Sequence, residues 1–223
     1  TEEARRLVDR LPAANPKLPA QLRSEVLKLT PRARPETRRA DSCVLIASEP
    51  GIEIPAVLTG SGSRATIFFT DNGIVRDLAS DTVREMARES TVLVIEPRGL
   101  SMASERRLAN QAAILLGRPL PGMWVRDMLA AFDYLKSERR FRSVSISAAG
   151  RYAGLTALLA AVLEPGLESA RIEGLFPSFL DVLGKDAIAE IPGMLRLADI
   201  PQLVRAAGRA RVTLVQSPPG AGS

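Results

Sequence analysis

Two glycines four positions apart mark the part of the sequence where catalytic chemistry would be expected. In "SVSISAAGRYAG" a run of strand-forming residues meets Gly150, and Gly154 lies at the start of an Ala/Leu-rich segment. A strand that turns sharply into a helix with the spacing G-x-S-x-G carries a nucleophilic serine at its middle position in one large group of enzymes. Here the middle position is Tyr152. A phenol with a pKa of about 10 is a poor nucleophile for acyl transfer, so the pattern predicts the turn without its usual nucleophile.

The base that such a nucleophile needs is missing as well. The 223 residues include no histidine, and histidine is the usual general base near neutral pH. A Ser-His-Asp triad therefore cannot be assembled from this chain alone. Ser101, Ser104 and Ser147 remain as substitute nucleophiles, for which the sequence offers only lysines or carboxylates as bases.

Composition limits the other classes of function. Hydrophobic residues make up 46% of the chain, which is typical of a globular domain, and no apolar run approaches the roughly 20 residues that cross a bilayer. The lone Cys43 excludes an internal disulfide and argues against a zinc site made of thiolates. The formal charge of +5 and the basic clusters "PRARPETRRA" and "SERRFR" keep a polyanion-binding module open as a third hypothesis, although aromatic residues are only 4%.

Hydrophobic patterns divide the chain into an arm and one domain. Residues 1–41 are polar and punctuated by proline, with short helices expected in "EEARRLVDRL" and "PAQLRSEVLKL", and 42–223 form the domain. Two strands flank Pro50 and Gly51 as an antiparallel hairpin. Apolar strands then alternate with amphipathic helices: the strands are expected at 65–70, 91–99, 143–150, 170–176 and 211–220, and the helices at 77–90, 107–117, 123–138, 152–164 and 194–208. This alternation predicts a doubly wound, mostly parallel α/β sheet with a leading antiparallel hairpin and helices on both faces.

Four segments in this order resemble the α/β-hydrolase superfamily, in particular its esterase and prolyl-oligopeptidase-like branch that includes acetyl xylan esterase-like proteins. "VIEPRGLSMAS" is similar to the D-x-R-G-x-G-x-S loop of that branch, with Glu96 in place of the Asp. "RDMLAAFDYLKS" resembles the helix before the nucleophile turn, and "SAAGRYAG" resembles the turn itself. The segment from "FPSFLDV" to "VTLVQ" is similar to the region that leads to the acidic member of a triad. Together the matches cover roughly residues 43–216.

The resemblance assigns roles to particular residues. It implies that Gly150, Tyr152 and Gly154 are the remnant of a nucleophile turn, and that Asp71, Asn72 and Gly73 are the remnant of an oxyanion loop. We expect Tyr152 to have strained dihedral angles and to point toward the loops "TDNG" and "EPRGLS".

Other residues are expected to support the structure. Arg98 should tie loops together through a carboxylate, and Trp124 should be a core residue. The place of the acid is "SPPGAGS", which has no carboxylate, so no catalytic, cofactor-binding or metal-binding residue is predicted.

Three functions remain open at this stage. The first is a non-catalytic α/β-hydrolase-like domain, an accessory or C-terminal part of a larger, bacterial esterase-like protein, with a stabilising, oligomerising or substrate-access role. The second is an active carboxylic-ester hydrolase whose missing base comes from an absent segment or a partner. The third is the polyanion-binding module.

Partners and compartment follow from the first hypothesis. We expect a neighbouring domain of the same protein or a second copy as partner, and neither nucleic acid nor membrane. Because the chain begins with Thr1, we expect a processed product or a piece of a longer protein. The resemblance to secreted esterases implies a location outside the cytoplasm, while the sequence itself leaves the compartment open.

Overall fold

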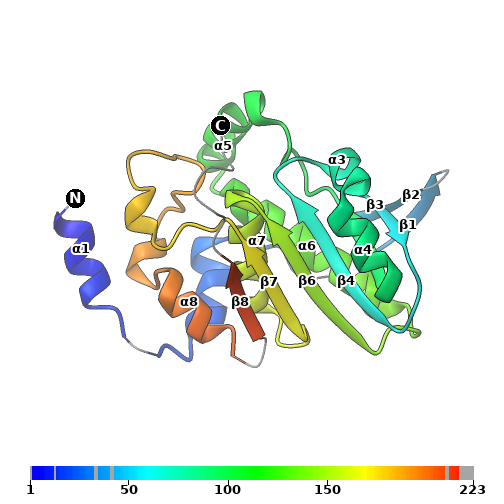
Figure 1. Ribbon diagram of the computed structural model, residues 1–223. Helices are drawn as coiled ribbons and strands as arrows, with labels where there is room; N and C mark the ends of the chain where they lie inside the picture. The colour runs from blue at the N-terminus through cyan, green and yellow to red at the C-terminus, as the bar shows by residue number, and fades with distance from the viewer. Residues whose placement is uncertain (1, 13, 33–34, 41–42, 209–210, 216–223) are drawn as a thin grey trace.

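One mixed sheet determines where the other elements of the protein lie (Figure 1). The computed structural model describes residues 2–12, 14–32, 35–40, 43–208 and 211–215. Within these ranges the strands are β1 (Thr37–Ala40), β2 (Cys43–Glu49), β3 (Ile52–Thr59), β4 (Arg64–Thr70), β5 (Thr91–Ile95), β6 (Ser143–Ala149), β7 (Ser169–Glu173) and β8 (Arg211–Val215). They form a single sheet in the order β1-β2-β3-β5-β4-β6-β7-β8.

The sheet has an antiparallel part and a parallel part. β1, β2, β3 and β5 pair antiparallel in succession, and β5, β4, β6, β7 and β8 pair parallel. The mostly parallel α/β sheet with a leading hairpin at Pro50 and Gly51 is therefore confirmed. Strand β1 was not expected, and it lies in the part of the sequence that was assigned to the arm.

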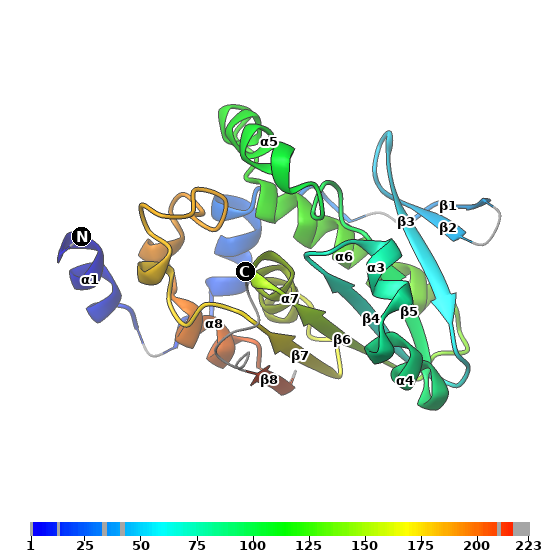
Figure 2. The same ribbon diagram turned by 45° about the horizontal axis from the view of Figure 1, so that its top comes forward.

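Helices lie on both faces of the sheet, as Figures 1 and 2 show. On one face α6 (Leu120–Ser137) and α7 (Arg151–Leu163) pack on the central strands, and α8 (Ile200–Ala206) packs beside α7. On the other face α3 (Ile74–Ala79) and α4 (Asp81–Glu89) cover β4 and β5. Helix α7 is apolar almost all round, with every residue from Ala153 to Leu163 buried, which is typical of a helix inside a large core.

The second face is covered only in part. Along β6 the residues Val144, Ile146 and Ala148 are buried, whereas the serines between them are half-buried. On the neighbouring strands Arg171 and Thr213, which are in register with Ser147, are exposed. Figure 1 shows this side of β6, β7 and β8 uncovered by any helix of the described residues. Strand β6, which was expected to be an apolar strand, therefore has one buried apolar side and one row of half-buried serines.

The N-terminal arm is packed on the domain. Its elements are α1 (Glu2–Asp9), α2 (Leu18–Gln21) and the π-helical turn η1 (Leu22–Val26), as the helical spacing predicted. Leu18, Leu22 and Leu27 are buried in the main core. Arg32 donates hydrogen bonds to Asp133 and Glu164, which fixes the end of the arm to α6 and α7.

Helix α5 (Ala103–Leu115) stands out from the rest of the molecule in both views. Only Arg106, Asn110 and Ala113 of this helix are buried. None of the helices in the described ranges combines the length and the apolar character that a membrane span requires.

Candidate functional site

The turn between β6 and α7 has the sharp geometry that the two glycines predicted. Gly150 has a φ of 120° and precedes the first residue of α7. A Cβ atom at this position would lie 2.5 Å from Cγ of Asp71, so only glycine fits. At Gly154 a Cβ atom would lie 3.0 Å from Cγ2 of Ile172, which explains a small residue where α7 packs on β7.

The expected strain at Tyr152 was wrong. Tyr152 is the second residue of α7, and among the described residues Lys28 is the only non-glycine with a positive φ. The unusual backbone conformation falls on Gly150 instead, two positions earlier. Because a glycine absorbs the turn, Tyr152 enters the helix with ordinary dihedral angles.

Asp71 occupies the start of α7. This residue directly follows β4, and its carboxylate accepts hydrogen bonds from the amide of Ala153 at 2.8 Å and the amide of Tyr152 at 3.2 Å. Free amides at a helix N-terminus attract anions, and Asp71 supplies that anion from within the chain. Burial raises the pKa of Asp71, while the hydrogen bonds from the Ala153 and Tyr152 amides act in the opposite direction.

The side chain of Tyr152 is held on several sides. Its hydroxyl lies 3.1 and 3.2 Å from the two carboxylate oxygens of Asp186. The guanidinium of Arg106 lies over the ring, 4.6 Å from its centroid, and Trp124 packs against it at 5.7 Å. Burial, followed by the carboxylate of Asp186, raises the pKa of Tyr152 to about 12. The hydroxyl thus bonds to the segment after β7, and not to either of the two loops that the sequence suggested.

Two residues that complete this cluster were missed in the sequence. Asp186 also pairs with Arg151 at 3.1 Å and accepts from the amides of Ile188 and Ala189. Asp186 lies in an irregular segment with no repeating pattern. Arg106 is a buried charge on α5, most of whose residues are exposed. Neither position carries a local signal that would have pointed to Tyr152.

The other two residues of the expected oxyanion loop, Asn72 and Gly73, make contacts within and between loops. Gly73 has a φ of 89°, and a Cβ atom there would lie 2.8 Å from Cβ of Ser101, so the two loops touch at this glycine. The Asn72 amide donates to Oγ1 of Thr70. Next to this loop the carboxylate of Asp77 accepts from both the amide and the hydroxyl of Thr70, and burial raises the pKa of Asp77.

The three serines considered as substitute nucleophiles are not gathered at one place. The hydroxyl of Ser101 donates to Glu96, whose other oxygen accepts from the amide of Ile74 at 3.1 Å. Ser104 is exposed on α5. Ser147 is half-buried on β6 and belongs to the row of serines on the uncovered side of the sheet. Only Ser101 therefore combines a hydroxyl with a carboxylate acceptor.

The expected support residues are in place. Arg98 donates hydrogen bonds to Asp127, Glu49 and Ser48, and it joins the loop after β5 to α6 and β2. Trp124 is fully buried, and its indole N–H donates to the carbonyl of Arg98 at 2.8 Å. The expected position of the acid, "SPPGAGS", lies outside the described residues. Within the described ranges no group of three His, Cys, Asp or Glu side chains is placed to hold a metal ion.

Comparisons with known proteins agree with this architecture. No protein-family model matches the sequence, and no curated protein matches it. Among solved structures, the chain is similar to a provisionally named acetyl xylan esterase from Bacteroides fragilis, with a TM-score of 0.72 and 10% identity, over 96% of this chain and 73% of that one. It is also similar to the acylaminoacyl peptidase of Pyrococcus horikoshii, with a TM-score of 0.52 and 14% identity. That match covers 82% of this chain but only 32% of the peptidase.

These similarities are structural, because the identities are far below those that relate functions. The match to the Bacteroides fragilis structure shows a shared fold over 96% of this chain. The chain has the α/β-hydrolase fold of esterase-like proteins.

Proposed function

We propose that this chain is a non-catalytic α/β-hydrolase domain that acts as an accessory part of a larger esterase-like protein. The fold supports descent from enzymes that cleave esters, and the similar structure from Bacteroides fragilis is named as an acetyl xylan esterase. The residues at the remnant site support the loss of that chemistry. Fold alone does not decide function, so the proposal depends on the site.

The position of Asp71 is the observation that carries the proposal. In an α/β-hydrolase the amide after the nucleophile stabilises the negative oxygen of the tetrahedral intermediate. The corresponding amide here is that of Ala153, and it already donates to the Asp71 carboxylate at 2.8 Å. A second anion at the same amide would meet the charge of Asp71 at close range. An ester carbonyl would therefore have to displace an internal ligand before it could be polarised.

The environment of Tyr152 adds to this argument. A nucleophile is normally activated by a neighbouring base and a lowered pKa. Tyr152 has the reverse, because burial and the negative charge of Asp186 raise its pKa to about 12. At neutral pH the phenolate fraction is then negligible, and Asp186 is already used by Arg151 and by two backbone amides.

The test is sustained turnover of p-nitrophenyl acetate near neutral pH by the purified chain and its Tyr152→Phe and Ser101→Ala variants. We expect no turnover that either substitution lowers, because a triad cannot form without histidine. Lysine side chains and the N-terminal amine react slowly with such an ester, so only turnover beyond one equivalent counts. Loss of turnover in Ser101→Ala or Tyr152→Phe would overturn the proposal and favour an active ester hydrolase.

The accessory role is supported by the outer surface of α5. Leu108, Leu115 and Leu116 are 71%, 88% and 76% exposed, and clustered exposed leucines are typical of surfaces that meet another protein. A domain that contributes shape and contacts would keep its fold after its catalytic residues were lost. The uncovered side of β6, β7 and β8 is a second surface that a neighbouring domain could cover.

A further inference from the structure

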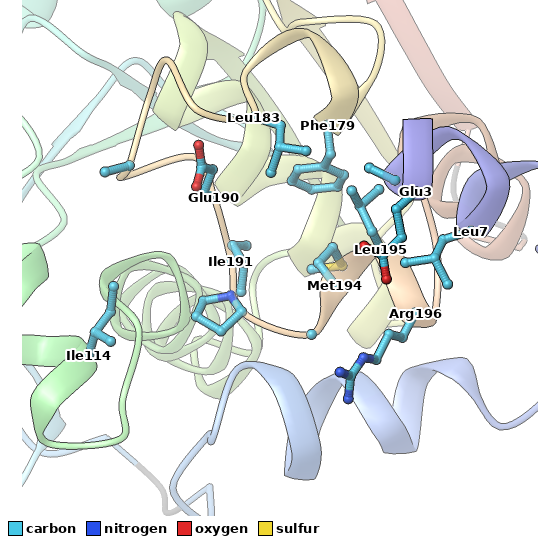
Figure 3. A pocket seen from close by; sticks show the side chains of 14 residues that line it. Glu3, Leu7, Ile114, Phe179, Leu183, Glu190, Ile191, Met194, Leu195 and Arg196 are labelled. Atoms are coloured by element: carbon cyan, nitrogen blue, oxygen red, sulfur yellow. The ribbon is translucent and has the colours of Figure 1, made fainter. Parts of the chain in front are cut away.

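A pocket of about 440 Å³ lies between the arm and the segment that follows β7 (Figure 3). Helix α1 forms one wall, and the 3₁₀ turns η2 (Phe179–Asp181) and η3 (Met194–Arg196) with the chain between them form the other. This volume is within the range of small-molecule sites in proteins. The pocket is separate from the remnant turn, because neither Tyr152 nor the residues that contact its side chain, Arg106, Trp124 and Asp186, line it.

The wall formed by η2 and η3 is fixed by internal contacts. Phe179 is 3% exposed and packs edge-on against Phe176, with ring centroids 5.4 Å apart. Met194 is 1% exposed and is the first residue of η3, directly after Gly193. The carboxylate of Glu190 accepts a hydrogen bond from the amide of Gly184, which closes the loop between them. The pocket is therefore bounded by ordered side chains on this side.

The lining of the pocket is mostly apolar, but its charged side chains carry a net negative charge. Glu3 and Glu190 contribute two carboxylates and Arg196 one guanidinium. Glu3 pairs with no cation among the described residues, whereas its neighbour Glu2 pairs with Arg6. Figure 3 shows Glu3 beside Leu195, while the guanidinium of Arg196 extends away from Phe179 and Leu183. An apolar pocket with an unpaired carboxylate at its mouth is complementary to an apolar molecule that carries a positive charge.

We propose that this pocket binds a small apolar amine, with the hydrocarbon part among the side chains of Phe179, Leu183 and Met194 and the ammonium group near Glu3. The hydrocarbon part would remove apolar surface from water on both walls. The carboxylate of Glu3 would distinguish an amine from an acid or an alcohol of the same length. The proposal does not depend on the loss of ester hydrolysis, because it uses none of the residues around Tyr152.

The experiment is isothermal titration of the whole chain with octylamine, octanoate and octanol, which share one hydrocarbon chain and differ in charge. We expect saturable binding of octylamine and weaker binding of the other two. Glu3→Gln should bind octylamine at least about threefold more weakly, since an exposed ion pair contributes modestly, and Glu190→Gln should have a smaller effect. Glutamine at position 190 can still accept from the Gly184 amide. Glu2→Gln, on the same helix but outside the pocket, is the matched control and should change nothing.

Blocking variants test the location. Ala187→Trp and Leu7→Trp add bulk from opposite walls at positions that are exposed in the free protein. Each should abolish octylamine binding while the far-ultraviolet circular dichroism spectrum is unchanged. Equal affinity for octanol or octanoate, an equal loss in Glu2→Gln, or full binding in both folded tryptophan variants would overturn the proposal.

Discussion

At the scale of single residues, Gly150 and Asp71 depend on each other. The Asp71 carboxylate can approach the amides of Tyr152 and Ala153 only because no side chain stands on Gly150. As a result, the first amides of α7 are hydrogen-bonded to a side chain of the same protein. Glycine is therefore required at position 150 for two reasons: its φ of 120° and the close approach of the Asp71 carboxylate.

Replacement of Gly150 by alanine should therefore be far more damaging than replacement of an open glycine. Gly150→Ala combines a strained φ with a Cβ atom 2.5 Å from Asp71 Cγ, and we expect a loss of at least about 3 kcal/mol in the free energy of unfolding. Gly184→Ala is the matched control, because Gly184 has a φ of 73° but a Cβ atom added there would have no neighbouring atom within 4 Å. It should lose about 1–2 kcal/mol.

A double-mutant cycle separates the two causes at Gly150. In the background Asp71→Gly the clash is gone and only the backbone strain remains, so the loss caused by Gly150→Ala should shrink by about 1 kcal/mol or more. Urea unfolding of the four proteins measures this. An unchanged loss would mean that the backbone angle alone accounts for the glycine.

Asp71 should also give the stability of the protein a characteristic pH dependence. Burial raises the pKa of Asp71 in the folded state, so the folded protein binds this proton more tightly than the unfolded chain does. The stability that protonated Asp71 contributes is then present below about pH 4, the ordinary range of an aspartate, and is lost as the pH rises through the raised value. We expect the Tm of the wild type to fall relative to that of Asp71→Asn between about pH 4 and pH 7. Asp181→Asn, at an exposed position, should show no such trend, and a trend in the opposite direction for Asp71→Asn would show that the helix amides outweigh burial.

The residues of the site could be predicted from the sequence only where a local pattern existed. Gly150, Tyr152 and Gly154 could be placed, because strand, turn and helix residues follow each other directly. The partners of the Tyr152 side chain could not be found from the sequence, because they are distant along the chain: Arg106 precedes Tyr152 by 46 positions and Asp186 follows it by 34. That Asp71 would turn its carboxylate onto α7 depends on the parallel pairing of β4 with β6, which brings Thr70 beside Ala149.

At the scale of secondary-structure elements, β6 shows how much information about burial the residue pattern of a strand contains. The sequence S-V-S-I-S alternates between polar and apolar residues, which is typical of a strand with one wet face. The structure confirms this alternation in burial. Reading the same residues as one apolar run lost that information.

Two neighbouring substitutions on β6 test the alternation. Ile146→Ala should lower the free energy of unfolding by about 2–5 kcal/mol, because Ile146 is 1% exposed in the main core. Ser147→Ala, one position along, should change it by no more than about 0.5 kcal/mol, because the side chain faces the uncovered side. Urea unfolding of both variants supplies the measurement. Similar losses at both positions would mean that another element covers the serine row in solution.

The same physics explains which elements could be predicted. Long segments such as α6 and α7 can be identified as helices from their sequences alone. The hairpin can be identified because Pro50 and Gly51 are typical turn residues. β1, with the residues Thr37, Arg38, Arg39 and Ala40, has no apolar pattern, because it lies at the edge of the sheet and its side chains are exposed where the structure describes them. Such a strand is defined by its hydrogen bonds to β2 rather than by burial, so composition alone reads it as linker.

At the scale of the whole molecule, the described residues form a well-packed core beneath an incompletely covered surface. The arm, α6 and α7 close one side of the sheet through buried leucines and the hydrogen bonds of Arg32. On the other side the serine row of β6 is open, and α5 presents leucines to solvent. The core accounts for folding, whereas the surface is what an accessory domain would use.

The leucines of α5 should make the isolated chain self-associate as its concentration rises. Leu108 and Leu115 lie seven positions apart on one helical face, and Leu116 follows at the end of α5, so burial of these three exposed side chains in a contact is favourable. Sedimentation velocity over a hundredfold range of concentration should show a growing larger species in the wild type. Leu115→Glu should suppress that species, because a charge would be buried in the contact. Arg107→Gln changes the net charge by the same amount at an exposed position on another side of α5, and it should have a much smaller effect. If the wild type stays monomeric throughout, a second copy is not the partner of α5, and the accessory role would have to be sought in a neighbouring domain of the same protein.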